Sequence, residues 1–380
     1  MESIQLCDIN KCTQCYACHN ICPKQCINMK LSKDGFVIPV IDRNSCIQCG
    51  VCMKSCHIIT PKVKFQTPIK NYACWTKNQK DRENSSSGGA FSVIARKVLE
   101  EEGIVFGATI TEDLKIKHIA IETPKELILL QGSKYVQSFL GNTYDVVKKE
   151  LKSGRKVLFT GTPCQVAGLI TFLNKSYENL ITCDIICHGV PSQISFDIYI
   201  DKINIKNRSI KFNFRFTKGW GFQLSRQDKK NYKHLIYPSD AYYLRAFNKG
   251  LMFSEACYKC FYARLERISD FTLADYWGLG LKIPFNHSIQ KGISCLLINN
   301  KKALNFIREC SELEYEERPF EEIIAGNYNL THSSKRPIGR DSYFEDTKRL
   351  KITQLIRKYK LQASWRDYLR LIKQSIISKL

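Results

Sequence analysis

"CTQCYACHNICP" (residues 12–23) and "CIQCGVCMKSCH" (residues 46–57) are two copies of one cysteine run, Cys-x2-Cys-x2-Cys-x3-Cys. The two-residue gaps let the backbone curl around an iron–sulfur cube, so that the first three thiolates of a run bind the same cube. The fourth cysteine lies too far along the chain to close that cube, and in chains with two such runs it reaches across to the other one. The repeat therefore predicts two 4Fe–4S clusters with exchanged fourth ligands.

This pattern assigns eight ligands and predicts a two-cluster ferredoxin module over residues 1–60. Zinc also uses Cys-x2-Cys pairs, but two complete four-cysteine runs favour iron–sulfur clusters. His57 stands where the pattern usually has proline, which removes no ligand, and we expect the spare Cys7 and Cys26 to be small buried residues. The ligands of the first cluster are Cys12, Cys15, Cys18 and Cys56, and those of the second are Cys46, Cys49, Cys52 and Cys22.

Length and composition leave room for one large domain beyond this module. The chain has 380 residues, of which 44% are hydrophobic, as expected for a globular protein with a core. The start, "MESIQLCDIN", does not resemble a signal peptide, and no run approaches 18 apolar residues, so we expect a cytoplasmic protein without a membrane span. In such a chain, 18 cysteines favour bound metal over disulfides.

The formal charge of +22 makes nucleic acid and acidic lipid the usual candidate partners. No aromatic and basic recognition motif accompanies the charge, so we expect no nucleic-acid partner. In "ASWRDYLRLIKQSIISKL" (residues 363–380), helical spacing places an apolar face beside basic residues. We expect this helix to dock on its own domain, with an anionic membrane surface or an acidic electron donor as the alternative. The apolar face comprises Trp365, Leu369, Ile372 and Ile376, and the basic residues are Arg366, Arg370 and Lys373.

After a proline-containing linker (residues 61–70), strand-like and helix-like segments alternate. The fold class is therefore predicted as α+β, with the ferredoxin-like module followed by a mixed α/β domain over residues 71–330 and a basic helical tail over residues 331–380. Residues 103–110, 116–122, 156–160 and 179–187 are predicted strands, and residues 123–130, 142–154 and 164–174 are predicted helices.

Two loops have features of nucleotide contacts. "SSSGG" (residues 85–89) lies directly before a predicted helix, so that backbone amides and the helix dipole could bind a phosphate, although an ordinary cap by Ser86 or Ser87 fits equally well. "TGTPCQ" (residues 160–165) lies between a strand and a helix, where open α/β sheets bind ligands. Neither loop matches a dinucleotide or P-loop motif.

Four further cysteines could form a third metal site. Two of them, Cys164 and Cys187, each follow a predicted buried strand, and the other two form a Cys-x2-Cys pair. Four thiolates suit either a third 4Fe–4S cluster or a structural zinc ion. Cys183 could replace Cys187, whereas Cys74, Cys295 and Cys310 are expected core residues. The four candidates are Cys164, Cys187, Cys257 and Cys260.

Several stretches, in order from residue 7 to about 280, give the chain a specific resemblance to a known family. They are "SSSGGAFSVIA", "QGSKYVQS", "GTPCQVAGL", "ICHGVPS", "FRFTKGWG", "CYKCFYARLERISDFTLADYWG" and the two cysteine runs. The chain resembles the beta subunit family of coenzyme F420 (deazaflavin) hydrogenases and dehydrogenases, in the bacterial form with a fused two-cluster ferredoxin module. The resemblance implies that the mixed α/β domain binds FAD and its own 4Fe–4S cluster, giving three clusters in all.

Carried over residue by residue, the resemblance implies FAD contacts in the "SSSGG" and "GSK" stretches, and the position of the "TGTPCQ" loop adds Gly161 and Thr162 as candidate contacts. It places Lys134 near the flavin ring or the substrate, although a solvated lysine is the alternative. His188 is a candidate proton donor, or else a histidine that caps a turn. The candidate cofactor contacts are Ser86, Ser87, Gly88, Gly89, Gly132, Ser133, Lys134, Gly161 and Thr162.

Together these observations predict an iron–sulfur flavoprotein oxidoreductase. Clusters pass single electrons, organic substrates exchange hydride equivalents, and a flavin converts between the two. We expect a soluble electron donor or acceptor protein, a small organic substrate that is deazaflavin-like or different, and an oligomeric assembly. The alternative is a non-catalytic electron-transfer subunit of a larger redox complex.

Overall fold

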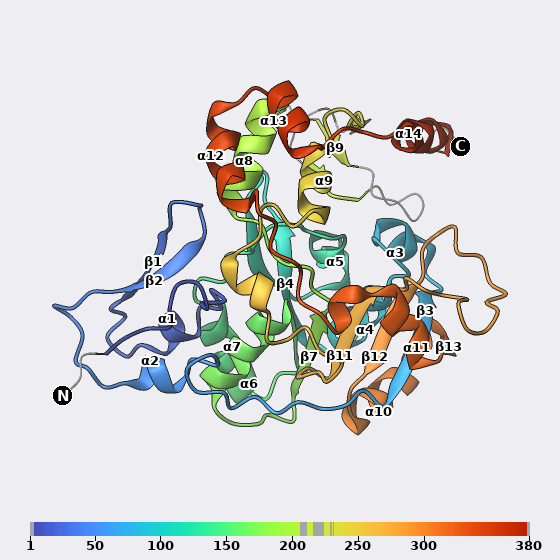
Figure 1. The fold of residues 1–380 in the computed structure, drawn as a ribbon. Coiled ribbons are helices and arrows are strands. Elements are labelled where there is room, and N and C mark those ends of the chain that lie inside the picture. The colour runs from blue at the N-terminus through green and yellow to red at the C-terminus, as the bar shows by residue number, and fades with distance from the viewer. Residues whose placement is uncertain (1–3, 206–210, 216–223, 229, 231, 378–380) are drawn as a thin grey trace.

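The protein is described by a computed structural model that covers residues 4–205, 211–215, 224–228, 230 and 232–377, with the backbone alone for residues 373–377. The resemblance-bearing stretch "FRFTKGWG" lies mostly outside these residues. Figure 1 shows the N-terminal segment at one side of a large sheet, with further helices and a small sheet above it.

Each cysteine run contains one short helix, so the repeated sequence adopts a repeated conformation. Both helices begin after a residue in the left-handed region, Tyr16 with φ 64° and Gly50 with φ 71°. A two-stranded antiparallel ribbon connects them, with Ile27 opposite Ile41. The bounds are α1 Ala17–Ile21, β1 Ile27–Leu31, β2 Val37–Ile41 and α2 Val51–Lys54.

An eight-stranded mixed sheet forms the centre, in the order β13-β3-β12-β11-β7-β6-β4-β5. Neighbours among β4, β6, β7 and β11 run parallel, and the remaining pairs run antiparallel. The bounds are β3 Lys70–Thr76, β4 Ile104–Ile110, β5 Ile116–Ile121, β6 Val157–Thr160, β7 Leu180–Ile185, β11 Phe271–Asp275, β12 Ser294–Ile298 and β13 Leu313–Glu317.

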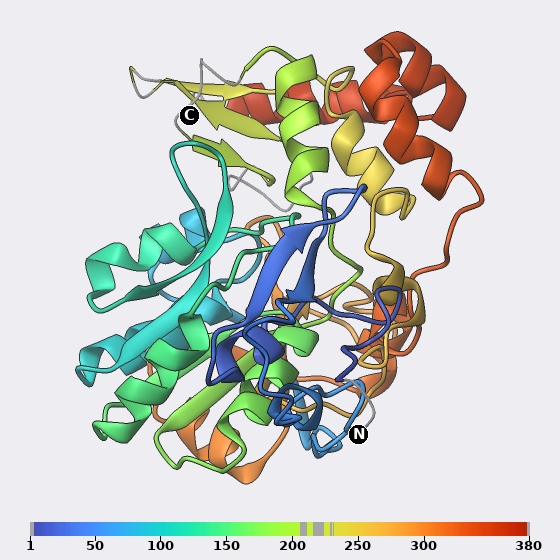
Figure 2. The ribbon, with the colours of Figure 1, turned by 90° about the vertical axis from the view of Figure 1, so that its left-hand side faces the viewer.

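Helices cover both faces of this sheet, because successive strand residues point to opposite sides. Val105 and Leu158 pack with α4 and α10, whereas Ile104 and Val157 pack with α6 and α7. The helix α1 packs on α6 and α7, and Figure 2 shows the N-terminal segment against this side of the sheet. The bounds are α3 Gln79–Asn84, α4 Ala90–Glu100, α5 Leu127–Leu130, α6 Thr143–Lys152, α7 Pro163–Leu173, α10 Lys301–Arg308 and α11 Phe320–Gly326.

A third layer with an aromatic core lies above the sheet in Figures 1 and 2. The rings of Phe196 and Phe214 lie 5.0 Å apart, and those of Tyr199 and Tyr243 also lie 5.0 Å apart. The small sheet has the order β10-β9-β8. The bounds are α8 Gln193–Lys202, β8 Lys211–Asn213, β9 Ser225–Gln227, β10 Lys233–Leu235, α9 Tyr242–Asn248, α12 Arg340–Arg349, α13 Ile352–Tyr359 and α14 Trp365–Ile377.

The predicted mixed α/β architecture is confirmed, and most of the predicted elements appear within one or two residues of their expected ends. The segment 123–130 differs in one respect, because a 3-10 turn over Pro124–Glu126 precedes the short helix α5. Thr123 and Glu126 still form the expected capping box. Among the described helices, none combines the length and the apolar character needed to cross a membrane.

One prediction for the tail is wrong. The apolar face of α14 does not dock on the rest of the chain, because Trp365, Leu369 and Ile372 are 67%, 54% and 57% exposed. The side chains of Lys373 and Ile376 lie outside the described part of the structure. The expected core positions Cys74, Cys295 and Cys310 are all buried.

Candidate iron–sulfur and cofactor site

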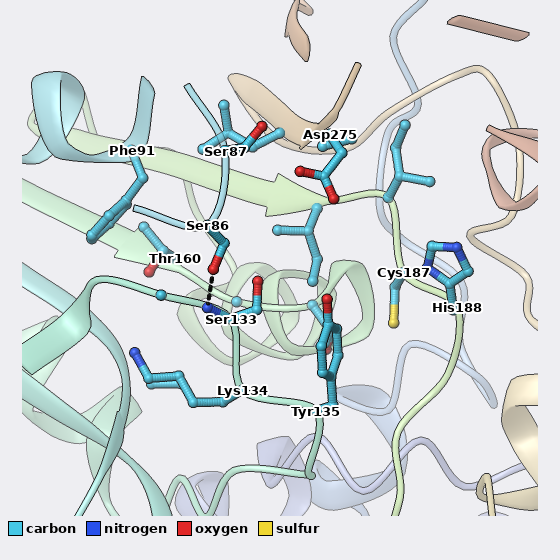
Figure 3. Close-up of a pocket in the computed structure, with 18 of the residues that line it drawn as sticks. Ser86, Ser87, Phe91, Ser133, Lys134, Tyr135, Thr160, Cys187, His188 and Asp275 are labelled. Atoms are coloured by element: carbon cyan, nitrogen blue, oxygen red, sulfur yellow. Dashed lines mark hydrogen bonds between the residues drawn. The ribbon is translucent and has the colours of Figure 1, made fainter. Parts of the chain in front are cut away.

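A cavity of about 340 Å³ opens at the carboxyl ends of the parallel strands. Its walls include Thr160 at the end of β6, Ile185 at the end of β7 and Asp275 at the end of β11. This is the place where open α/β sheets bind ligands, and the volume is typical of small-molecule sites. Figure 3 shows side chains from separate segments, among them Ser86, Ser133 and Asp275, around this cavity.

The "SSSGG" and "GSK" stretches meet at this cavity. The Oγ of Ser86 accepts a hydrogen bond from the Ser133 backbone amide at 2.8 Å, shown dashed in Figure 3. The hydroxyl of Ser87 donates to the carbonyl of Ile293 at 2.7 Å, which fixes the first loop on the sheet. Two loops that are 47 residues apart in sequence therefore form one wall. Of the nine predicted cofactor contacts, those that line the cavity are Ser86, Ser87, Gly89, Gly132, Ser133, Lys134, Gly161 and Thr162.

Gly88, the remaining one, is absent from the residues that line the cavity. A Cβ atom built at this position would come within 2.1 Å of the Cys74 carbonyl oxygen and 2.5 Å of the Ser294 amide nitrogen. Glycine is therefore required there because the loop lies so close to the backbones of two strands, and the phosphate contact of Gly88 stays a prediction. Gly89 precedes α4 with φ 86°, a left-handed conformation that glycine adopts readily.

Lys134 lies in the wall with its ammonium group close to backbone carbonyls. Its Nζ donates to Leu130 at 2.8 Å and to Gln131 at 3.0 Å. Burial, with a smaller contribution from the charge of Lys211, lowers the pKa of Lys134 to about 7. The side chain can therefore change protonation state near neutral pH, unlike the solvated lysine that was the alternative.

His188 and the Arg215–Asp275 ion pair lie at another side of the cavity. Partial desolvation of the ring by the cavity wall lowers the pKa of His188 although the residue is exposed, and the charge of Asp275 acts in the opposite direction. Arg215 Nη1 lies 2.5 Å from Asp275 Oδ2. Figure 3 shows Asp275, His188 and Cys187 on the side opposite Lys134. The sequence analysis did not single out Arg215 or Asp275, although both lie in stretches that carry the family resemblance.

His118 is a further lining residue that sequence reasoning missed. One ring nitrogen lies 2.9 Å from the Thr160 carbonyl, so it carries the proton, and the other accepts from the Ser138 hydroxyl at 2.9 Å. Gln165 donates to Ser138 at 3.0 Å and extends the network to the start of α7. Burial lowers the pKa of His118 to about 4, so the ring is neutral. A single histidine in a strand gives no sequence signal for such a role.

The structure brings the first predicted ligand set together, including its distant fourth member. Burial raises the pKa of Cys15, and the charges of Cys18, Cys12 and Cys56 raise it further. The thiol of Cys7 hydrogen-bonds to Cys56 and lowers the pKa of Cys56 to about 6. Cys7 is half-buried rather than fully buried, because it lies at the edge of the same small cavity as the four ligands.

The second ligand set lines its own small cavity. Cys22 from the first run lies there with Cys46, Cys49 and Cys52 from the second run. The spare Cys26 is buried, as expected, and its Sγ lies 3.4 Å from that of Cys22. The two fourth ligands thus lie with the opposite runs, as the spacing predicts.

The third set of cysteines also converges. Burial raises the pKa of Cys257, and the nearby charges of Cys187, Cys260 and Cys164 raise it further. Cys183, the alternative to Cys187, interacts with Asp184 and Asp270 instead. Within the described ranges, no three His, Cys, Asp or Glu side chains are placed to share a single metal ion, and this applies equally to the N-terminal sets.

The first and third sets meet along one face of α7, because Gly168, which contacts Cys15, and Cys164 are four residues apart in this helix. A Cβ atom at Gly168 in this helix would come within 2.9 Å of Cys15 Sγ, while Cys164 lies in the first turn of the same helix. Cys164 and Cys187 line the large cavity, and so does Thr13 from the N-terminal segment. The side chain of Gln137, also in the cavity wall, donates to Gln14 Oε1 at 2.6 Å. The arrangement therefore continues from the N-terminal cysteines through the third set to the cavity.

Models of known protein families match most of the residues that form this arrangement. Residues 71–142 match the N-terminal model of the coenzyme F420 hydrogenase/dehydrogenase beta subunit, and residues 154–322 match the C-terminal model of the same subunit. Residues 11–58 match a 4Fe–4S dicluster domain.

Individual relatives are more distant. NADH-quinone oxidoreductase subunit I 2 of Geobacter metallireducens is 31% identical over 67 residues, covering 16% of this chain and 51% of the relative. The chain thus spans about half the length of that relative. A solved structure of the xenon-derivatised F420-reducing nickel–iron hydrogenase complex from Methanosarcina barkeri covers 77% of this chain and 92% of its own chain, at 15% identity and a TM-score of 0.46.

Proposed function

Since the chain belongs to the coenzyme F420 hydrogenase/dehydrogenase beta subunit family and carries a 4Fe–4S dicluster domain, we propose that it is an iron–sulfur flavoprotein oxidoreductase. It passes electrons between 4Fe–4S clusters and FAD and so reduces or oxidises a small organic substrate. The observation that carries this proposal is the shared cavity, where the loops around Ser86 and Ser133 face Cys164 and Cys187.

The donor set of the cavity fits a flavin nucleotide. Helix α4 begins at the cavity after Gly89, and the first amides of a helix have no partner within the helix, so they suit a pyrophosphate. The hydroxyls of Ser86 and Ser87 and the amides near Gly132 add polar groups, while Phe91 and Leu130 add an apolar surface. When bound, FAD would supply the exchange between hydride equivalents and single electrons.

Lys134 and His188 are the residues that we propose to handle protons. With a pKa of about 7, Lys134 can hold or release a proton at Nζ in neutral solution. His188 lies at the exposed side of the cavity, near Asp275, where a substrate would enter. Neutral His118 positions the strand ends through its hydrogen bonds and holds the wall in place.

Cys164, Cys187, Cys257 and Cys260 are the proposed ligands of a third 4Fe–4S cluster. Their place between Cys15 and the cavity supports an electron-transfer role, whereas a structural zinc ion would gain nothing from that place. Cys49 of the second set is exposed, so a soluble electron carrier is proposed to meet the chain there. The order is then the second cluster, the first, the third and the flavin.

A non-catalytic electron-transfer subunit is the second candidate function. It is favoured by the names of the family and of the curated relative, both of which describe a subunit. A cytoplasmic location and oligomeric assembly are consistent with both candidates and are proposed with them. The two differ in what the cavity holds, since only the enzyme needs a flavin that a hydride donor can reduce.

Anaerobic purification followed by absorbance spectroscopy and iron and flavin analysis tests the proposal. We expect one FAD per chain together with the broad absorbance of iron–sulfur clusters, and bleaching of the flavin bands by a hydride donor. If both the wild-type chain and Ser133→Ala contain iron–sulfur clusters but no flavin, the non-catalytic electron-transfer subunit would be favoured. Flavin lost only from variants of the cavity wall would support the enzyme.

A further inference from the structure

Helix α14 presents an unusually apolar face to solvent. Trp365, Tyr368, Leu369 and Ile372 are 67%, 45%, 54% and 57% exposed, and their spacing of three and four residues places them on one side of the helix. The opposite side, with Asp367, is half-buried. Figure 1 shows α14 at the periphery of the molecule, at the end of the chain.

The start of this helix is fixed, so the apolar face has a defined direction. Leu361, four residues before the helix, is fully buried, and its carbonyl accepts a hydrogen bond from Arg245 Nε in α9 at 2.6 Å. Asp367 caps the helix by accepting from the backbone amide of Ser364 at 2.8 Å and from its hydroxyl at 2.9 Å. The helix is therefore anchored on the protein at its base and held with its apolar side outward.

Basic side chains follow one edge of the apolar face. Arg366 and Arg370 lie one turn apart and are both exposed, and Arg370 is 3.6 Å from Asp367. Arg357 on α13 and Lys360 after it add exposed positive charge. A helix with tryptophan and leucine on one face and arginine beside it is typical of segments that lie in the interface of an anionic membrane.

We propose that α14 binds the surface of membranes that contain anionic lipids, lying parallel to the bilayer with Trp365, Leu369 and Ile372 in the headgroup region. Charge complementarity favours this occupant. A second copy of the helix would bring the same arginines together, and an acidic protein would be attracted by the charge without needing the continuous apolar stripe. The redox site would then be held at a membrane surface, which the proposed function does not by itself require.

Flotation of the full-length protein with vesicles tests this proposal. We expect binding to phosphatidylcholine vesicles with roughly one-third phosphatidylglycerol and much weaker binding to pure phosphatidylcholine. Replacing both arginines (R366Q with R370Q) should weaken binding roughly thirtyfold, since each basic residue near such a surface contributes about 1 kcal/mol. Leu369→Ser should weaken it by about tenfold or more, because a buried leucine contributes roughly 1.5–3 kcal/mol. Leu281→Ser, which changes an apolar residue that is 64% exposed elsewhere, is the matched control and should bind as the wild type does.

A fluorescence measurement keeps the test independent of any folding defect. Brominated lipids should quench part of the tryptophan emission of the wild type, and Trp365→Phe should lose that quenching while still floating with the vesicles. Flotation that does not depend on lipid charge, or that persists in the Leu369→Ser variant, would overturn the proposal. So would a salt-sensitive complex with an acidic protein in the absence of any vesicle binding.

Discussion

The hydroxyl of Tyr262 and Nδ1 of His57 form a hydrogen bond of 2.6 Å between residues that are 205 positions apart in the chain. The other ring nitrogen of His57 lies 3.0 Å from the hydroxyl of Thr13. His57 follows Cys56 of the first ligand set, and Tyr262 lies two residues after Cys260 of the third. This pair therefore fixes the distance between the two sets, and it uses the histidine that stands where the cysteine pattern usually has proline.

Removing the hydroxyl should loosen this contact without removing a ligand. Tyr262→Phe leaves a buried ring nitrogen of His57 without its partner, which costs roughly 1–3 kcal/mol of the free energy of unfolding. Anaerobic urea denaturation measures the loss, and the iron content should not change. Tyr237→Phe is the control, because this tyrosine is 65% exposed. Equal effects in the two variants would mean that the His57 contact does not stabilise the protein.

Iron analysis tests the number of clusters. Three sets of four cysteines predict roughly twelve iron atoms and an equal amount of sulfide per chain. The sample must be prepared without oxygen, because exposed clusters are easily lost. About eight irons together with one zinc would instead assign the third set to a structural ion.

Cys164→Ala should interrupt electron flow between the N-terminal clusters and the flavin. The eight N-terminal ligands do not include Cys164, so both N-terminal clusters should persist. A low-potential one-electron donor should then still reduce these clusters, but the flavin should fill slowly, while a hydride donor should reduce it directly.

Cys49→Ala is the matched variant for this experiment, since it removes an exposed ligand at the far end. Electrons should still pass between the third cluster and the flavin in this variant. Anaerobic stopped-flow spectra separate the two variants. Wild-type filling of the flavin in Cys164→Ala, with unchanged iron content, would show that Cys164 binds no cluster.

Gly89→Ala should weaken cofactor binding more than backbone strain alone predicts. Gly89 has φ 86°, and a Cβ atom there would lie 2.7 Å from Thr76 Cγ2. The matched control is Gly154→Ala, where φ is 88° but nothing lies within 4 Å of the added atom. The control should lose only the roughly 1–2 kcal/mol of a left-handed alanine. Thermal unfolding and flavin content measure both effects, and equal flavin content in the two variants would argue against a cofactor contact by this loop.

Lys134 predicts a pH-dependent stability. Its pKa of about 7 in the folded protein lies below the ordinary lysine value of 10.5, so the unfolded chain binds more protons between these limits. The free energy of unfolding of the cofactor-free protein, compared with that of Lys134→Met, should therefore rise with pH above 7, by up to about 1.4 kcal/mol per pH unit. Lys125→Met at an exposed position is the control. A difference that stays constant from pH 7 to pH 10 would contradict the lowered pKa.

The sequence predicted well where the signal is local. The capping box of Thr123 and Glu126 requires residues three apart, and the paired strands β4 and β5 follow each other in the chain. The order of the large sheet had no such signal, because β3 pairs with β12 and β13 from the other end of the domain. The aromatic third layer around Phe196 and Tyr243 was not predicted either, since its parts are separated in sequence and packed only in space.

For the site, the cysteine spacings alone identify which residues can bind the two N-terminal clusters. Spacings of two and three residues fix the local curl of the backbone whatever surrounds it. Both cysteine runs can therefore be recognised without knowledge of the fold. The three-dimensional packing brings Cys164, Cys187 and Cys257 together and places His118 and Arg215 in the same cavity wall as Lys134. It also turns the apolar side of α14 outward. These relationships join segments whose separation is set by sheet order and helix packing, and no short-range spacing encodes them.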